Sequence, residues 1–186
     1  IRTRTGVAER RILTEETLED LARDAARAAL ADAGTSPGEL DLILCATVSG
    51  SYATPSLACL VQEALGATCP AMDLNAACTG FLYALDVAEG YFARKRVKRV
   101  LVVAAEALSG MTDWTDRATC VLFGDGAGAA VLGEGEDLLA LRLTASGSAE
   151  HLFIPRGNGR SPFSARPAKP PYLYMNGQEV YKFAVS

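Results

Sequence analysis

Two apolar runs dominate the hydrophobic pattern of the chain, a nearly continuous one at 40–48 and another at 100–105. Neither run alternates with polar residues, which is typical of strands buried on both faces of a sheet. Shorter apolar stretches predict further strands at 71–74, 120–123, 127–132 and 138–145.

Three other segments have a helical pattern instead. In the first, apolar residues recur three and four positions apart from Leu18 to Ala29; Thr14, followed by two glutamates, predicts its start, and Gly34 predicts its end. The second covers 56–65. The third, 81–93, is apolar on nearly every side, which predicts a helix buried inside the protein. This alternation predicts an α/β fold, with helices layered on a largely buried mixed sheet.

The last part of the chain differs in composition. Between His151 and Gln178 there is no acidic residue, and prolines and glycines accompany the cations Arg156, Arg160, Arg166 and Lys169. We predict two parts: 1–145, and a segment, 146–186, with an irregular basic loop and the start of a helix from Asn176. The loop is either a mobile connection or a docking surface for an acidic partner. Since the chain opens without methionine and ends inside this helix, we expect it to be a piece of a longer protein.

Charge and composition exclude several classes of protein. The formal net charge of −4 and the pI of about 5.1 predict no attraction to nucleic acid or anionic membranes. The apolar runs are too short to span a bilayer. Five cysteines without a C-x-x-C pair, beside a single histidine, argue against a metal site or a disulfide framework and predict a reducing cytoplasm.

Cys78 is the strongest candidate for chemistry. It lies in the segment DLNAACTGF at 73–81, between a predicted strand and the start of the buried helix. Unpaired N–H groups and the dipole at a helix N-terminus stabilise a thiolate, and the small neighbours Ala76, Ala77 and Gly80 leave room for an acyl group. The alternative is an inert buried cysteine, the role predicted for the other four.

The glycine-rich segment FGDGAGAA, at 123–130, matches a relaxed dinucleotide-binding fingerprint in spacing only. Such a fingerprint needs a helix after it, whereas the residues that follow predict strand and turn. We therefore predict a tight glycine turn between two strands, in which Asp125 accepts backbone hydrogen bonds.

Several motifs occur in the order found in β-ketoacyl-acyl carrier protein synthase III. They are IRTRTGV at 1–7, ERR at 9–11, DLNAACTGF at 73–81, DRAT at 116–119, FGDGAGAA at 123–130 and MNGQEV at 175–180. Together they resemble the first half of these enzymes and the start of the connection to the second half, and the likeness covers essentially the whole chain.

This resemblance implies a thiolase-like fold, in which two similar halves, each with a five-stranded mixed sheet, stack as an αβαβα sandwich. It implies that Cys78 takes an acyl group from acyl-coenzyme A, and that malonyl-acyl carrier protein then loses CO₂ and attacks the thioester. The product would be a β-ketoacyl-acyl carrier protein, the first step of type II fatty-acid elongation. Coenzyme A thioester is thus a substrate, no cofactor is implied, and the complete enzyme would be a cytoplasmic homodimer.

The resemblance also assigns substrate-binding residues. Arg4 and Arg117 would bind the nucleotide end of coenzyme A, with structural ion pairs as the alternative. Phe123, Met175 and Gly177 would line the tunnel that leads to the cysteine.

Thr54 would lie, across the dimer, at the far end of the acyl pocket and leave space for longer or branched primers. The alternative is that Thr54 caps the helix that follows Pro55 and Ser56. The catalytic histidine and asparagine of the family would lie in the second half, so this piece alone is expected not to complete the condensation. Two further readings stay open: a condensing enzyme of secondary metabolism, and a non-catalytic interaction subunit with the same fold.

Overall fold

The computed structural model describes residues 1–155, 163 and 170–185. The cations of the predicted basic loop, Arg156, Arg160, Arg166 and Lys169, lie outside these described residues. Two compact units are present. The sheet unit comprises Arg11–Ala107 and Asp125–Thr144, and the terminal unit comprises Ile1–Arg10, Leu108–Gly124 and Ala145–Ser186. The division into 1–145 and 146–186 stays a prediction.

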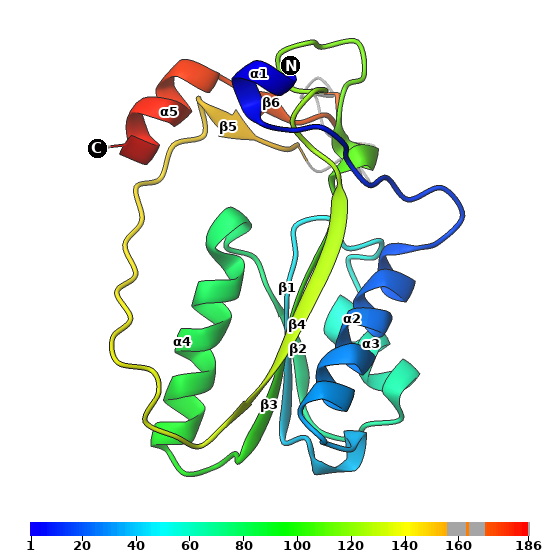
Figure 1. Cartoon of the computed structure of the whole chain (residues 1–186), viewed down its shortest axis with the longest axis vertical. Coiled ribbons are helices and arrows are strands. Elements are labelled where there is room, and N and C mark those ends of the chain that lie inside the picture. Colours follow the sequence, from blue (N-terminus) through cyan, green and yellow to red (C-terminus); the bar gives the residue numbers. More distant parts are fainter. Residues whose placement is uncertain (156–162, 164–169, 186) are drawn as a thin grey trace. The chain divides into compact units, whose positions relative to one another are not determined.

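A mixed four-stranded sheet forms the centre of the sheet unit (Figure 1). β1 is parallel to β2 and β3, and β3 is antiparallel to β4, in the order β2-β1-β3-β4. β1 is buried at every position, as its continuous apolar run predicts. The strands are β1 (Leu42–Ala46), β2 (Ala71–Leu74), β3 (Arg99–Ala107) and β4 (Asp125–Gly133).

Helices α2 (Leu18–Asp32) and α3 (Leu57–Leu65) cover one face of this sheet (Figure 1). The predicted start of the first helix at Thr14 is wrong. Thr17 is the N-cap: its hydroxyl accepts from the Asp20 N–H, and the Asp20 carboxylate accepts from the Thr17 N–H. This reciprocal pair satisfies two N–H groups at the start of α2 that have no carbonyl partner within the helix. The side of α2 on the sheet consists of Leu18, Ala22, Ala26 and Leu30.

Helix α4 (Gly80–Ala93) covers the opposite face of the sheet (Figure 1). Its small residues Ala84 and Ala88 are buried against β1 and β3, but Leu82 is 45% exposed. Within the sheet unit, the sheet covers one side of α4, and burial of the other side stays a prediction. No helix of the described residues is long and apolar enough to cross a membrane.

Two of the six strands that the apolar pattern predicts do not form in the described residues. The central sheet has four strands, one fewer than the resemblance implies. The apolar stretch at 120–123 forms turns, in which the Cys120 N–H donates to the Asp116 carbonyl and the Leu122 N–H donates to the Thr119 carbonyl. The stretch at 138–145 is irregular, and Leu139 is 92% exposed. Apolar composition alone does not supply the hydrogen-bonded neighbour that a strand needs.

The terminal unit contains short elements. The Arg10 guanidinium ties part of it together: it donates to the carbonyls of Cys120 (2.6 Å) and Phe123 (2.7 Å) and lies 5.6 Å from the ring centroid of Trp114. The helix predicted from Asn176 is confirmed and begins at Gly177. The elements are α1 (Arg2–Thr5), the 3-10 turn Leu108–Met111, the strand pair β5 (Leu152–Phe153) and β6 (Tyr174–Met175), and α5 (Gly177–Val185).

The carboxylate of Asp73, on β2, holds the start of α3. It accepts hydrogen bonds from the N–H groups of Leu57 and Ala58, both at 2.8 Å. Ser56 adds a third contact, because its hydroxyl accepts from the Cys59 N–H. A negative charge at a helix N-terminus meets unpaired N–H groups and the positive end of the helix dipole.

We therefore expect Asp73→Ala to lower the free energy of unfolding by about 2 kcal/mol, because two backbone N–H groups lose a charged acceptor. Urea unfolding followed by circular dichroism would measure this loss. Asp86→Ala removes an exposed carboxylate from α4 and serves as the control. Equal stability of the two variants would contradict the assigned role of Asp73.

Candidate active site

Cys78 lies where the sequence predicts it, in a turn between a strand and a helix. The turn is a 3-10 segment, Ala77–Thr79, which joins β2 to α4. Ala77 has φ of 47°, in the left-handed region that non-glycine residues rarely adopt. Cys78 is exposed in this chain. A strained turn directly before an exposed cysteine is a common arrangement for a nucleophile.

Gly80 sets how closely this turn approaches the sheet. A Cβ atom at this position would lie 2.9 Å from the Ala46 Cβ, closer than two such atoms can pack. Ala46 is the last residue of β1 and is buried, so it has little freedom to move away. Glycine at position 80 thus lets the first turn of α4 rest on the end of β1, with Cys78 beside it.

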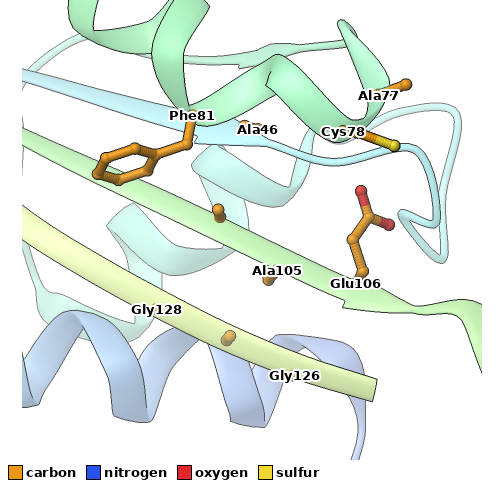
Figure 2. A pocket seen from close by; sticks show the side chains of 10 residues that line it. Ala46, Ala77, Cys78, Phe81, Ala105, Glu106, Gly126 and Gly128 are labelled. Atoms are coloured by element: carbon orange, nitrogen blue, oxygen red, sulfur yellow. The ribbon is translucent and has the colours of Figure 1, made fainter. Parts of the chain in front are cut away.

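A pocket of about 280 Å³ opens beside Cys78 (Figure 2). Small side chains at the ends of three strands form most of its wall, so that space remains next to the sulfur. Glu106, on β3, brings a carboxylate into the same pocket (Figure 2). The residues that line it are Ala46, Ala77, Cys78, Phe81, Ala104, Ala105, Glu106, Gly126, Ala127 and Gly128.

Glu106, Gly126 and Gly128 line the pocket but were not predicted to belong to a site. A single charged residue close behind the apolar run 100–105 was the available signal for Glu106. Burial raises the pKa of the Glu106 carboxyl, although hydrogen bonds from Ser49 and Val48 oppose that rise. Because the pKa is raised by folding, the protonated carboxyl favours the folded chain below the usual glutamate pKa, and this contribution disappears as the pH rises through the raised pKa.

The strand predicted at 127–132 is confirmed, but it begins at Asp125, so Gly126 belongs to β4 and the tight turn predicted between 123 and 127 is wrong. Antiparallel pairing with β3 takes the chain straight through Gly126, which lies opposite Glu106, and Gly128, which lies opposite Ala104. No helix follows, in agreement with the rejection of a dinucleotide fingerprint. Asp125 accepts a backbone hydrogen bond as predicted, from the Leu13 N–H at 2.8 Å.

The other predicted site residues fall in both units. Thr54 belongs to the sheet unit and is exposed. The alternative in which Thr54 caps the helix is wrong, since Ser56 is the N-cap of α3. The remaining predicted residues belong to the terminal unit, and their roles toward Cys78 stay predictions: Arg4, Arg117, Phe123, Met175 and Gly177.

The remaining cysteines differ from Cys78 in their surroundings. Cys45 and Cys69 are buried, and Cys59 and Cys120 are partly buried. Burial raises the pKa of the Cys45 and Cys69 thiols, which disfavours the reactive thiolate. In the part of the chain that the structure describes, no group of three or more histidine, cysteine, aspartate or glutamate residues could hold a metal ion.

Comparison with known proteins shows a likeness that covers the whole chain. A family model described as 3-oxoacyl-[acyl-carrier-protein] synthase III matches residues 72–147, which include Cys78. All of the chain aligns, at 48% identity over 191 residues, with a β-ketoacyl-[acyl-carrier-protein] synthase III of Oceanobacillus iheyensis. The chain is thus similar, over its whole length, to β-ketoacyl-[acyl-carrier-protein] synthase III proteins. It spans somewhat more than half of this curated relative, 57% of its length, and corresponds to the first half of the synthase.

Solved structures of synthase III proteins show the same fold. The synthase III of Aquifex aeolicus matches 98% of this chain and 56% of its own, with a TM-score of 0.87 and 46% identity. The priming β-ketosynthase of the R1128 polyketide pathway matches 98% of this chain and 56% of its own, with a TM-score of 0.85 and 34% identity. The thiolase-like prediction is confirmed by these likenesses.

Two glycines of α4 provide a matched test of the packing beside Cys78. We expect Gly80→Ala to lower the free energy of unfolding by about 1–3 kcal/mol, because the added methyl overlaps Ala46. We expect Gly90→Ala to raise it by up to about 1 kcal/mol, because no atom lies within 4 Å of the added Cβ and alanine favours helix. Urea unfolding of both variants checks the signs, and a stabilised Gly80→Ala would refute the close approach.

Proposed function

We propose that this chain carries the nucleophile of a condensing enzyme that starts fatty-acid chains from an acyl-coenzyme A primer. The observation that carries this proposal is the exposed Cys78 at a strand-to-helix turn, next to a pocket walled by alanine and glycine, in a chain similar to synthase III proteins. The complete protein is proposed to act as a cytoplasmic homodimer without a bound cofactor.

The proposed chemistry has two stages. The Cys78 thiolate attacks the thioester carbonyl of acyl-coenzyme A, the acyl group passes to the sulfur, and coenzyme A leaves as its thiolate. Malonyl-acyl carrier protein then loses CO₂, and the resulting carbanion attacks the acyl-Cys78 carbonyl, which releases the Cys78 thiolate and forms the β-ketoacyl product. The donors that stabilise the second stage are expected in the second half of the protein, so this chain by itself is proposed not to complete the condensation.

The substrate's nucleotide end is proposed to bind Arg4 and Arg117. Both side chains are exposed, and Arg117 lies in a turn braced by Asp116, whose carboxylate accepts from the Ala118 N–H and the Thr119 hydroxyl. Among the described residues, no ion pair engages either arginine, which weakens the structural alternative. Exposed guanidinium groups are well suited to phosphate oxygens.

Primer choice is proposed to depend on Thr54 and on the tunnel residues Phe123, Met175 and Gly177. The alanines and glycines of the pocket wall, together with a threonine rather than a bulky aromatic at position 54, favour longer or branched acyl groups. A condensing enzyme of secondary metabolism is the closest rival, and the likeness to the R1128 priming ketosynthase supports it. A non-catalytic interaction subunit is disfavoured by the exposed nucleophile beside an open pocket.

Mass spectrometry after incubation with acyl-coenzyme A tests the nucleophile. We expect one acyl adduct, which maps to Cys78, and none in Cys78→Ala. Cys59→Ala is the matched control, because that cysteine is partly buried and lies in α3. If the complete protein formed no adduct, or formed it at another cysteine, the proposal would fail.

The same assay with acetyl, branched and aromatic thioesters separates fatty-acid from secondary-metabolite primers. Thr54→Phe in the complete protein is expected to reduce the adduct from branched primers relative to acetyl, because the ring would fill the far end of the pocket. An unchanged chain-length profile would show that Thr54 does not select the primer.

Trp114 offers a direct test of the nucleotide site, because it is the sole tryptophan of the chain and lies in the same turn region as Arg117. We expect coenzyme A to change its fluorescence, and Arg117→Ala to weaken binding by about tenfold, the cost of one charged contact. Arg142→Ala, at an exposed position of the sheet unit, is the control. Equal affinity of the two variants would exclude Arg117 from the site.

A further inference from the structure

The carboxylate of Glu106 is the one ionisable group, besides the Cys78 thiol, among the residues that line the described pocket. Figure 2 shows it extending from β3 toward the end of the pocket where the sulfur lies. Other carboxylates of this region point elsewhere: Asp73 binds the start of α3, and Asp125 binds Leu13. Glu106 is therefore the acidic side chain that lines the space beside Cys78.

The Glu106 carboxylate is engaged by the segment that follows β1, Thr47–Ser49. One oxygen accepts from the Val48 N–H at 2.8 Å, and the other accepts from the Ser49 hydroxyl at 2.5 Å. The Ser49 hydroxyl accepts in turn from the Ala107 N–H at 2.8 Å. Because Thr47 and Ser49 are buried, water cannot readily replace these contacts.

The segment held by Glu106 is continuous with the wall of the pocket. Ala46, directly before it, lines the pocket and carries the methyl group on which Gly80 rests. A shift of Thr47–Ser49 would therefore move the end of β1 or change the opening beside Cys78. Glu106 belongs to the neighbouring strand β3, so its carboxylate joins two strand ends that backbone pairing no longer connects beyond Ala46 and Ala104.

We propose that Glu106 is a positioning residue, which fixes the Thr47–Ser49 segment and thereby limits the size of group that can enter the pocket beside Cys78. That the entering group is an acyl group rests on the proposed function. Entry to the pocket itself can be measured without any acyl transfer. In Glu106→Gln, the amide oxygen can still accept from the Val48 N–H, and the NH₂ group can donate to the Ser49 hydroxyl. Both hydrogen bonds then lose the charge of the carboxylate, so the segment is held less tightly.

The test compares two alkylating reagents on this chain: iodoacetamide, and an iodoacetamide that carries an N-octyl tail. Rates of modification at Cys78 are measured under native conditions by peptide mass spectrometry. In Glu106→Gln we expect the ratio of the octyl rate to the small-reagent rate to rise about fivefold, the effect of replacing charged hydrogen bonds by neutral ones on an equilibrium. Glu89→Gln removes a carboxylate from an exposed position of α4 and is expected to leave the ratio unchanged.

Ser49→Ala tests the same contact from the other side. It removes the hydroxyl and leaves the hydrogen bond from the Val48 N–H to the carboxylate in place, so the ratio should rise in the same direction. The double variant should raise the ratio by less than the product of the two separate fold-changes, because both substitutions weaken one network. If Glu106→Gln failed to fold, the Ser49→Ala ratio would decide.

A purely structural role predicts a different result. It would lower the urea midpoint of Glu106→Gln and leave the ratio of the two alkylation rates as in the unsubstituted chain, and that outcome would overturn the proposal. Failure of Cys78 to accept an acyl group from acyl-coenzyme A is a separate result, which would reject the proposed function and leave the alkylation ratio informative.

Discussion

The contact between Gly80 and Ala46 fixes the geometry on which the candidate site depends. With no side chain at position 80, the first turn of α4 rests directly on the end of β1. The chain reaches this point from β2, and the left-handed conformation of Ala77 turns it sharply toward the helix. These constraints hold Cys78 at the carboxyl ends of parallel strands, an edge where binding sites of α/β proteins commonly form.

Two carboxylates organise the same edge of the sheet. Asp73, from β2, anchors the start of α3, and Glu106, from β3, anchors the segment after β1. Asp73 accepts from two backbone N–H groups, and Glu106 accepts from the Val48 N–H and the Ser49 hydroxyl. These backbone N–H groups lie where regular pairing ends and would otherwise have no partner. The site thus has a rigid rim made by charged acceptors, around a wall of small side chains that leaves space for a substrate.

This arrangement bears on the proposed choice of primer. The position of Cys78, the proposed nucleophile, depends on backbone conformation and close packing. The size of the pocket depends instead on single side chains and on the position of Thr47–Ser49. A fatty-acid enzyme and an enzyme with another starter can therefore share the same turn around the cysteine and differ in the wall, consistent with likeness to both kinds of protein.

Much of the fold follows from patterns along the chain. The apolar runs predicted β1 and β3. The sequence also placed Cys78 between a strand and an apolar helix. The ordered motifs indicated the likeness to synthase III proteins. Each of these signals is local, because backbone conformation and burial of a short segment depend largely on its own residues.

Only the tertiary structure decided which apolar stretches became strands and which residues surround the sulfur. The stretch at 138–145 has the composition of a strand but no paired neighbour, whereas the glycine-rich stretch at 125–133 pairs with β3. The closeness of Gly80 to Ala46, and of Glu106 to Ser49, joins residues far apart in the chain. Such contacts depend on how segments pack against one another, and the order of residues within any one segment does not record its partner.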